Sequence, residues 1–161
     1  MTQRSVTIEI RPADSEEAVA STRLLLKEYA SALGRHLSFE EFARELTDLP
    51  GEYGPPHGVL LLASCNGRLA GCVALRPLDE GLCEMRRLYV RHQFRGKGVG
   101  KRLSLAVIDE ARERGYRAMR ISLAPWMEEA IAIYHSLGFR SIEPYRPGPL
   151  NGVVFMEFQL H

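Results

Sequence analysis

The stretch that decides the fold is YVRHQFRGKGVGKRL, Tyr89–Leu103. A strand-like run ends at about Val90, and a sequence with helical periodicity begins at about Gly100. Glycine tolerates positive φ and has no Cβ, so its backbone N–H groups can converge closely on a ligand. The first N–H groups of a helix have no acceptor inside the helix, and the helix dipole adds partial positive charge there. The stretch therefore predicts an anion-binding junction between a strand and a helix.

Two familiar phosphate-binding patterns do not fit this stretch. A P-loop would need glycine where Arg95 stands and a hydroxyl residue where Arg102 stands. A dinucleotide-binding fingerprint would need glycine where Lys101 stands. The pattern that fits is Arg-x-x-Gly-x-Gly over residues 95–100.

Apolar periodicity and turn residues predict the elements around this junction. Alternation in SVTIEIRP indicates a first strand, and Asp14 or Ser15 can cap the helix after it. Ser38 with Glu41 forms a capping box for a second helix. Asn66-Gly67 is typical of a type I′ hairpin turn, because both positions take positive φ. The remaining predicted elements are a hairpin over 59–77, strand 82–90, helix 100–114, strand 117–124, helix 127–137 and strand 152–160.

This order of elements predicts an α/β fold, with one mixed sheet and helices packed on both of its faces. Strand 82–90, helix 100–114 and strand 117–124 form a βαβ unit, so the two strands should run nearly parallel.

Strict alternation along strand 82–90 makes a further prediction about its faces. It places Glu84 and Leu88 on one face of the sheet, and Cys83 and Tyr89 on the other.

The composition is that of a globular protein, with 45% apolar and 25% charged residues in 161. We expect one domain over 1–161, since this length can bury a core of its own. No apolar run approaches the roughly 18 residues that a membrane span needs. The N-terminal sequence also lacks the apolar centre of a signal peptide. We therefore expect a cytoplasmic protein with no membrane partner.

Cysteine and histidine spacing argues against a metal site. Cys65, Cys72 and Cys83 are odd in number without C-x-x-C spacing, and the five histidines are scattered. We expect the cysteines to be small core residues and the protein to use no metal.

Charge is distributed unevenly along a chain whose net charge is only +1. Between Glu84 and Arg102 there are seven basic residues and one acid, whereas residues 1–52 hold ten acids and six bases. Aromatic residues are not interleaved with the basic ones, as a surface that stacks nucleic-acid bases requires. We therefore expect no nucleic-acid partner.

Three motifs in order resemble the GNAT family of N-acetyltransferases. The loop RGKGVG over 95–100 is similar to the acyl-CoA-binding loop of that family. EMRRLYV over 84–90 resembles its fourth strand, and AIAIYHSLGF over 130–139 resembles a later helix with its Tyr-x-x-x-Gly-Phe ending. The order of elements matches from about Val6 to Leu160.

The resemblance implies that acetyl-CoA is the acyl-donor cosubstrate. In such a fold strands 82–90 and 117–124 splay apart and leave a V-shaped slot for the pantetheine arm. Main-chain groups at the end of the first strand would pair with its amides, and a backbone N–H there would polarise the thioester carbonyl. Basic side chains, Arg102 among them, would neutralise the phosphates. The implied cofactor-binding residues are Leu88, Tyr89, Val90, Arg95, Gly96, Lys97, Gly98, Val99, Gly100 and Lys101.

Tyr134 is the candidate general acid, because it stands at the matching tyrosine position of the family. A phenol with a pKa of about 10 stays protonated at neutral pH and can donate to the sulfur of the leaving group. The alternative is a core role, since Ala130, Ile133 and Leu137 share its helical face.

Glu84 is the candidate general base, directly or through a water, because it is a lone acid on a basic strand where some family members carry a catalytic glutamate. The alternative is an ion pair with a neighbouring arginine such as Arg86. Cys83 would allow an acyl-cysteine route, but nothing in the sequence pairs it with a histidine. The family also generally transfers the acyl group directly.

These observations predict an N-acetyltransferase that acts directly on a primary amine of a small molecule or a peptide. A non-catalytic acyl-CoA sensor would carry the same loop and is the alternative. Segments 30–42 and 49–58 would select the acceptor, and the acidic lean of residues 1–52 would suit a cationic amine or a lysine-bearing peptide. Family habit also suggests a homodimer through strand 152–160.

Overall fold

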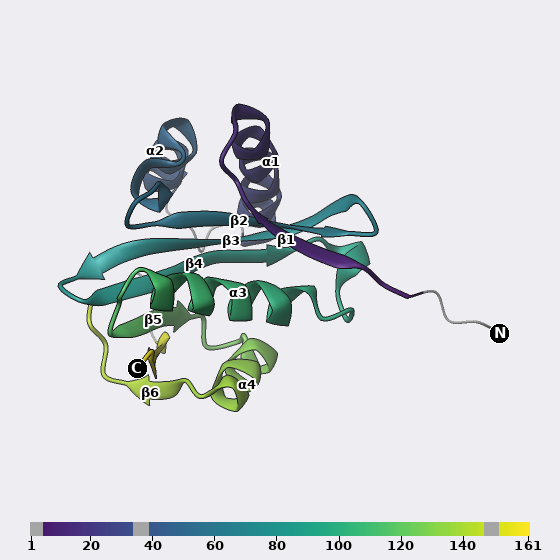
Figure 1. Cartoon of the computed structure of the whole chain (residues 1–161). Helices are drawn as coiled ribbons and strands as arrows, with labels where there is room; N and C mark the ends of the chain where they lie inside the picture. Colours follow the sequence, from purple (N-terminus) through teal and green to yellow (C-terminus); the bar gives the residue numbers. More distant parts are fainter. Residues whose placement is uncertain (1–4, 34–38, 147–151) are drawn as a thin grey trace.

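Seven strands form one mixed sheet in the computed structural model, which describes residues 5–33, 39–146 and 152–161 (Figure 1). The strand order across the sheet is β1-β2-β3-β4-β5-β7-β6. Neighbouring strands are antiparallel except for β4 and β5, which are parallel as the βαβ prediction requires. The strands are β1 (Ile8–Pro12), β2 (Val59–Cys65), β3 (Arg68–Asp79), β4 (Leu82–Val90), β5 (Ala118–Leu123), β6 (Arg140–Ile142) and β7 (Val154–Gln159).

Helices cover both faces of the sheet, which confirms the predicted fold class (Figure 1). One face carries α1 (Glu16–Leu33) and α2 (Phe39–Asp48), and the other carries α3 (Val99–Glu113) and α4 (Glu128–Leu137). Short 3-10 turns, η2 (Gly51–Tyr53) and η3 (His92–Phe94), follow α2 and β4. In the part of the chain that the structure describes, no helix is both long and apolar enough to cross a membrane.

Local signals place most of these elements correctly. The Ser15 hydroxyl accepts a hydrogen bond of 3.1 Å from the Ala18 N–H and so caps α1. Asn66 and Gly67 have φ of 51° and 81°, which confirms the hairpin turn. Ser38 of the predicted capping box lies outside the described residues. The three-residue strand β6 was not predicted, because so short a segment carries no usable periodicity.

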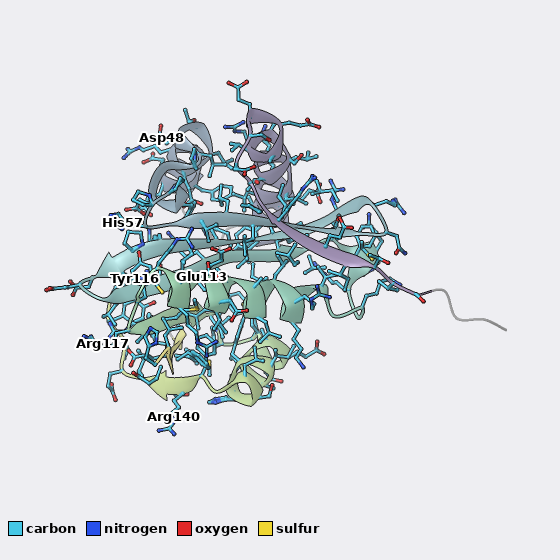
Figure 2. All side chains as sticks on the ribbon, in the orientation of Figure 1. Asp48, His57, Glu113, Tyr116, Arg117 and Arg140 are labelled. Carbon is cyan, nitrogen blue, oxygen red and sulfur yellow. The ribbon has the colours of Figure 1, made fainter. Side chains whose placement is uncertain are left out.

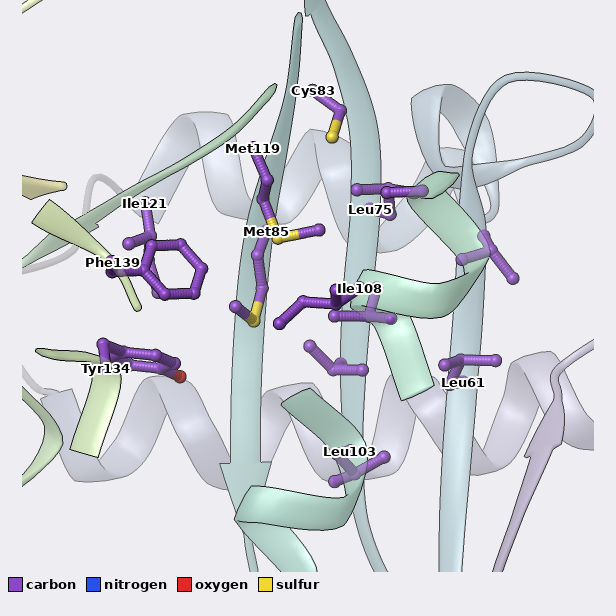
Figure 3. Packing of buried hydrophobic residues seen from close by; sticks show 14 of the residues in the cluster. Leu61, Leu75, Cys83, Met85, Leu103, Ile108, Met119, Ile121, Tyr134 and Phe139 are labelled. Atoms are coloured by element: carbon purple, nitrogen blue, oxygen red, sulfur yellow. The ribbon is translucent and has the colours of Figure 1, made fainter. Parts of the chain in front are cut away.

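Two apolar layers hold the helices to the sheet. On one face, Leu25 and Leu26 of α1 are fully buried against β2 and β3. On the other face, Leu103 of α3, Met85 of β4 and Met119 of β5 belong to one cluster, which Figure 3 shows at close range. Burying each such side chain contributes roughly 1.5–3 kcal/mol, so the sheet is fixed firmly between its helices.

The parallel pair β4 and β5 separates after a short contact. Their register contains three pairs, of which Glu84↔Arg120 is the last, and no further pairing is made among the described residues. The strands therefore diverge as the resemblance implied. We call the place where they part, just beyond Glu84 and Arg120, the fork.

A β-bulge in β4 overturns the alternation predicted for that strand. Cys72 of β3 pairs with Tyr89 and Ala74 pairs with Arg86, so between these two pairs β4 contains one residue more than β3. Arg87 lies in the bulge with a φ of 59°. As a result Leu88 packs with the α3 side and Tyr89 with the α1 side, the reverse of the prediction for both residues.

Candidate active site

The glycine loop, residues 95–100, adopts the conformation that its glycines allow. Gly96 and Gly98 have φ of 79° and 87°, and Gly98 is the N-cap residue of α3. The first hydrogen bond of α3 runs from the Arg102 N–H to the Gly98 carbonyl, 3.0 Å away, so the N–H groups of 99–101 have no helical acceptor. A Cβ added at Gly96 or Gly98 would meet no atom within 4 Å. The loop thus presents unpaired N–H groups on an open surface, an arrangement suited to phosphate.

Tertiary contacts divide the basic residues of this region into two groups. The first group points toward the N-terminal helices, where Arg87 Nε lies 2.8 Å from Glu45 Oε2 and Arg91 Nη2 lies 2.8 Å from Glu28 Oε2. Part of the acidity of residues 1–52 is therefore neutralised inside the molecule. The expectation of a cationic acceptor, which rested on that acidity, loses part of its basis.

The second group surrounds the glycine loop and pairs with no carboxylate among the residues that the structure describes. Arg95 Nε donates to the Val90 carbonyl at 3.1 Å, and Arg102 Nη2 donates to the Ile8 carbonyl at 3.3 Å. These carbonyl acceptors are neutral, so they do not compensate the positive charges. The group suits a ligand with several phosphates, and its members are Arg95, Lys97, Lys101 and Arg102.

Beyond the fork, β4 offers main-chain groups to the gap. The Arg91 N–H donates to the Ala70 carbonyl at 2.8 Å, so the main chain of Arg91 faces β3. Main-chain groups alternate in direction along an antiparallel strand. Those of Leu88 and Val90 therefore face the side from which β5 has diverged. An amide-bearing chain could bind this edge in the manner of an added strand.

Tyr89 lies on the same strand but turns away from the gap. Its main chain faces β3, and its hydroxyl donates to Glu28 Oε1 at 3.2 Å on the α1 side of the sheet. Among the residues predicted to contact the cofactor, Tyr89 is the one that this geometry supports least.

Tyr134 points from α4 toward β4 and α3 (Figure 3). Only 2% of the residue is exposed, and its ring meets Phe139 edge-on at a centroid distance of 5.3 Å. Burial raises the pKa of Tyr134 to about 12, and a hydrogen bond with the Ser104 side chain opposes that rise. Ser104 itself donates to the Gly100 carbonyl at 2.9 Å. The Tyr134 hydroxyl therefore lies beside the first turns of α3, close to the glycine loop.

The Glu84 carboxylate is surrounded by donors at the fork. The side chain is 1% exposed, with Arg76 Nη2 at 2.9 Å from Oε1 and Arg146 Nη1 at 2.6 Å from Oε2. The Tyr145 hydroxyl donates to Oε2 at 2.6 Å, and Arg86 Nε lies 3.5 Å from Oε1. Both oxygens are thus engaged, which favours the ion-pair alternative. The role of Glu84 as a base stays a prediction.

Sequence reasoning missed Tyr145 and Arg146, which close one side of the fork. Arg146 Nη2 also donates to Ser122 Oγ of β5 at 3.0 Å, so this guanidinium connects the two diverging strands. Both residues lie in the irregular segment after β6, where no periodicity points to a site. Their partner Glu84 is about 60 residues away in the chain, which is a contact that only folding creates.

Cys83 is placed where an acyl-cysteine route is disfavoured. It is fully buried, and burial raises the pKa of its thiol to about 12. A thiol held protonated in the core is a poor nucleophile. All three cysteines are buried and free, as core residues are.

A cavity of about 700 Å³ lies at the other end of the molecule. It is bounded by the start of α1, the segment around η2 and Arg114 after α3. The fifteen residues of α3 place the glycine loop about 22 Å from that end. Figure 2 shows His57, Tyr116 and Arg117 at this end. Within the described ranges, no three His, Cys, Asp or Glu side chains are grouped so as to hold a metal ion.

Comparison with known sequences connects this geometry to one family. A profile of the acetyltransferase (GNAT) family matches residues 22–139. An uncharacterised N-acetyltransferase of Schizosaccharomyces pombe is 36% identical over 140 residues, which cover 86% of each chain.

Solved structures show the same similarity. A GNAT-family acetyltransferase from Staphylococcus aureus Mu50 superposes with a TM-score of 0.79 at 19% identity, over 96% of this chain and all of the other. A putative acetyltransferase from Salmonella typhimurium, solved with its cofactor acetyl-CoA, superposes with a TM-score of 0.68 at 26% identity, over 96% and 94% of the two chains.

Proposed function

The chain belongs to the acetyltransferase (GNAT) family of acetyl-CoA-dependent enzymes, and from this premise we propose that it acetylates a primary amine of a small molecule or a peptide by direct transfer. One observation carries the proposal. The glycine loop lies at the end of β4, the unpaired main-chain edge of β4 runs from the fork to that loop, and the Tyr134 hydroxyl lies beside the first turns of α3.

The loop and the fork together fit the shape and charge of acetyl-CoA. The N–H groups of 99–101 would hold the diphosphate, with Lys97 and Lys101 compensating its charge. The main-chain groups of Leu88 and Val90 would pair with the pantetheine amides. Such contacts draw the acyl end into the fork, away from bulk water.

When bound there, acetyl-CoA supplies a thioester whose carbonyl carbon accepts the amine nitrogen. A main-chain N–H of β4 beyond the fork stabilises the negative charge that develops on the carbonyl oxygen. Removing one such donor typically costs about 100- to 1,000-fold in rate, so this main-chain contact is a large part of the proposed catalysis.

Tyr134 acts on the departing sulfur as a hydrogen-bond donor. Its pKa of about 12 keeps the phenol protonated throughout the neutral range. Complete proton transfer to a thiolate, whose conjugate thiol has a pKa of about 8.5, would be unfavourable by three to four pKa units. We therefore assign Tyr134 to stabilising the thiolate, while solvent supplies the final proton.

Glu84 acts through its neighbours in this proposal. A carboxylate that already accepts from Arg76, Arg146 and Tyr145 is poorly placed to take a proton from an ammonium group. It instead fixes the arginines around the fork, which makes it a positioning residue.

Calorimetric titration with acetyl-CoA, repeated with dephospho-CoA, tests the donor site. We expect binding in the roughly micromolar range that weakens when the 3′-phosphate is missing. No heat up to millimolar acetyl-CoA would show that the loop has been misassigned.

A measurement of turnover distinguishes an acetyltransferase from a non-catalytic acyl-CoA sensor. An acetyltransferase releases free CoA, measured with a thiol reagent, at a rate that depends on the added amine. Tight acetyl-CoA binding without amine-dependent release from any primary amine would support the sensor instead.

A further inference from the structure

The face of the fork opposite the glycine loop carries an unusual arginine. Arg86 lies two positions after Glu84, the last residue of β4 that pairs with β5, and points to the α1 and α2 side, where its Nη1 lies 3.8 Å from Glu45 Oε1. Its side chain is only 21% exposed. Its contacts with described carboxylates are this one and Glu84 Oε1 at 3.5 Å, and among the described residues it donates no hydrogen bond.

The other arginines at this face are held more closely. Arg87 makes two hydrogen bonds with Glu45, at 2.8 and 3.0 Å. Arg76 and Arg146 donate to Glu84 at 3.1 and 2.6 Å. The carboxylates next to Arg86 are therefore already satisfied by other guanidinium groups. Arg86 therefore has N–H donors without an acceptor among the described residues.

The charge count at this face favours an added anion. Four arginines meet three glutamates among the described residues, so one positive charge is in excess; the seven are Arg76, Arg86, Arg87, Arg146, Glu45, Glu52 and Glu84. Burial lowers the pKa of Arg86, and the nearby charge of Arg87 lowers it further. A half-buried guanidinium with too few partners is the side chain that a carboxylate would stabilise most.

Arg86 also lies close to the main-chain groups where the transfer is proposed to occur. Two residues along a strand span about 7 Å at most, so Arg86 lies within one small molecule of the main-chain groups at Leu88. The thioester enters from the α3 side, where the glycine loop and Tyr134 lie. In the proposed function the amine then approaches from the opposite face, which Arg86 occupies.

We propose that the acceptor is a small amine that also carries a carboxylate, such as a free amino acid, and that Arg86 binds this carboxylate. The inference rests on the proposed function and names its substrate class. In the transfer, the amine nitrogen forms a bond to the acetyl carbon and the carbon–sulfur bond breaks. The thiolate leaves with that electron pair, and the proton lost from nitrogen passes to solvent, which reprotonates the sulfur.

The experiment compares matched acceptors on the full chain. Each standard amino acid is assayed beside its amide, with spermidine as a cationic amine, and CoA release is recorded with saturating acetyl-CoA. We expect one or more amino acids to be acetylated with a KM about 10- to 100-fold below that of the amide. Preference for amides or for spermidine would overturn the inference and leave the proposed acetyltransferase standing.

Variants then assign the effect to Arg86. Arg86→Met should raise the KM for the amino acid by about 10- to 100-fold and leave both the KM for its amide and the Kd for acetyl-CoA unchanged. Arg86→Lys should restore part of the loss. Arg117→Met removes an exposed arginine at the far end of the sheet (Figure 2) and should change none of these values.

Two further outcomes would overturn the inference. One is an unchanged KM in Arg86→Met. The other arises if no amine is turned over: the amino acids are then titrated into protein saturated with CoA, and the inference fails if no binding depends on Arg86. Loss of acetyl-CoA binding in the wild-type chain would instead count against the proposed function itself.

Discussion

Gly67 and Gly98 share a backbone conformation but lie in different surroundings. Their φ values are 81° and 87°, and a Cβ at either position would meet no atom within 4 Å. Gly67 turns the hairpin between β2 and β3, whereas Gly98 caps the helix that begins at the glycine loop. Comparing the same substitution at Gly67 and at Gly98 therefore distinguishes the cost of backbone strain from the cost of losing a ligand contact.

We predict that Gly98→Ala raises the Kd for acetyl-CoA by about tenfold or more. An alanine at positive φ is strained by roughly 1 kcal/mol, and its methyl group projects onto the surface where the phosphates would lie. Calorimetry measures the Kd, and denaturant unfolding measures stability. Gly67→Ala is the control, with a similar loss of stability and an unaltered Kd. Equal effects of both variants on the Kd would contradict a special role for Gly98.

Tyr134 offers a second test at the scale of one residue. We predict that Tyr134→Phe lowers kcat by about 10- to 100-fold, because the sulfur loses one hydrogen-bond donor, while the Kd for acetyl-CoA stays the same. With a pKa of about 12 the phenol is protonated below that value, so its contribution should not decline between pH 7 and 10.

Tyr116→Phe serves as the control for this variant. Tyr116 is also buried, and its hydroxyl donates to the His57 carbonyl at 2.6 Å, at the end where β4 and β5 are paired rather than where they diverge. Its loss should cost about 1 kcal/mol of stability without a change in kcat. If Tyr134→Phe kept the wild-type kcat, Tyr134 would be a core residue only.

At the scale of the element, the bulge in β4 decides what the fork presents. It places Arg86 and Arg87 on the same face and turns Leu88 to the other. The Arg87 guanidinium pairs with Glu45 of α2 and lies over the rings of Tyr29 and Phe42. These contacts hold a residue whose left-handed backbone is otherwise unfavourable.

The Glu45–Arg87 pair should make the stability of the fold depend on pH. Burial alone would raise the pKa of Glu45, but the hydrogen bonds and charge of Arg87, with the charge of Arg86, outweigh it and lower the pKa. The stabilisation is therefore present above the unfolded pKa of about 4.3 and is lost as the pH falls through the folded value.

We predict that Glu45→Gln costs about 2 kcal/mol of stability at pH 7, as loss of a hydrogen-bonded charge does. The difference from wild type should shrink below pH 4. Urea unfolding across this range measures it. Glu110→Gln, which breaks the pair between α3 and Arg114 just after it, should cost only a few tenths of a kcal/mol. If the stability difference between Glu45→Gln and wild type stayed constant with pH, Glu45 would be excluded as the source of the pH dependence.

At the scale of the whole molecule, residues from both faces of the sheet surround the fork. The glycine loop and Tyr134 come from the α3 and α4 side, whereas Arg86 and Glu45 face α1 and α2. In the proposed function the donor and the acceptor approach the fork from opposite faces of the sheet. The cavity near Arg114 lies about one length of α3 away from the glycine loop, but its lining residue Tyr53 neighbours Glu45 and Arg86.

We predict that acetyl-CoA protects the fork and the loop from hydrogen exchange. The amides of Leu88, Val90 and residues 96–101 should slow, because they gain partners, and the hairpin at 65–68 should not change. At a concentration of 100 Kd the ligand should add about 2.7 kcal/mol to the stability. Protection centred on the segment 49–58 would point to the cavity near Arg114 instead.

Much of the fold could be predicted from local signals in the sequence. The hairpin at Asn66-Gly67, the start of α1 at Ser15 and the helix after Gly98 depend on residues close to one another in the chain. Turn and cap conformations are decided within a few residues, so a pattern of letters is enough to recognise them. For this reason the strand–loop–helix junction could be recognised in the sequence, and with it the resemblance to the family.

Only the tertiary structure decided the surroundings of the candidate site. Period-two alternation contains no extra residue, so it misplaced Leu88 and Tyr89 on β4. The partners of Glu84 include Arg146, which is 62 residues away, and no local pattern encodes such a contact. The sequence by itself determined which groups of atoms are present and which short segments hold them. Folding decided which charges cancel and which remain free to bind, because ion pairing depends on distances in space that separation along the chain does not set.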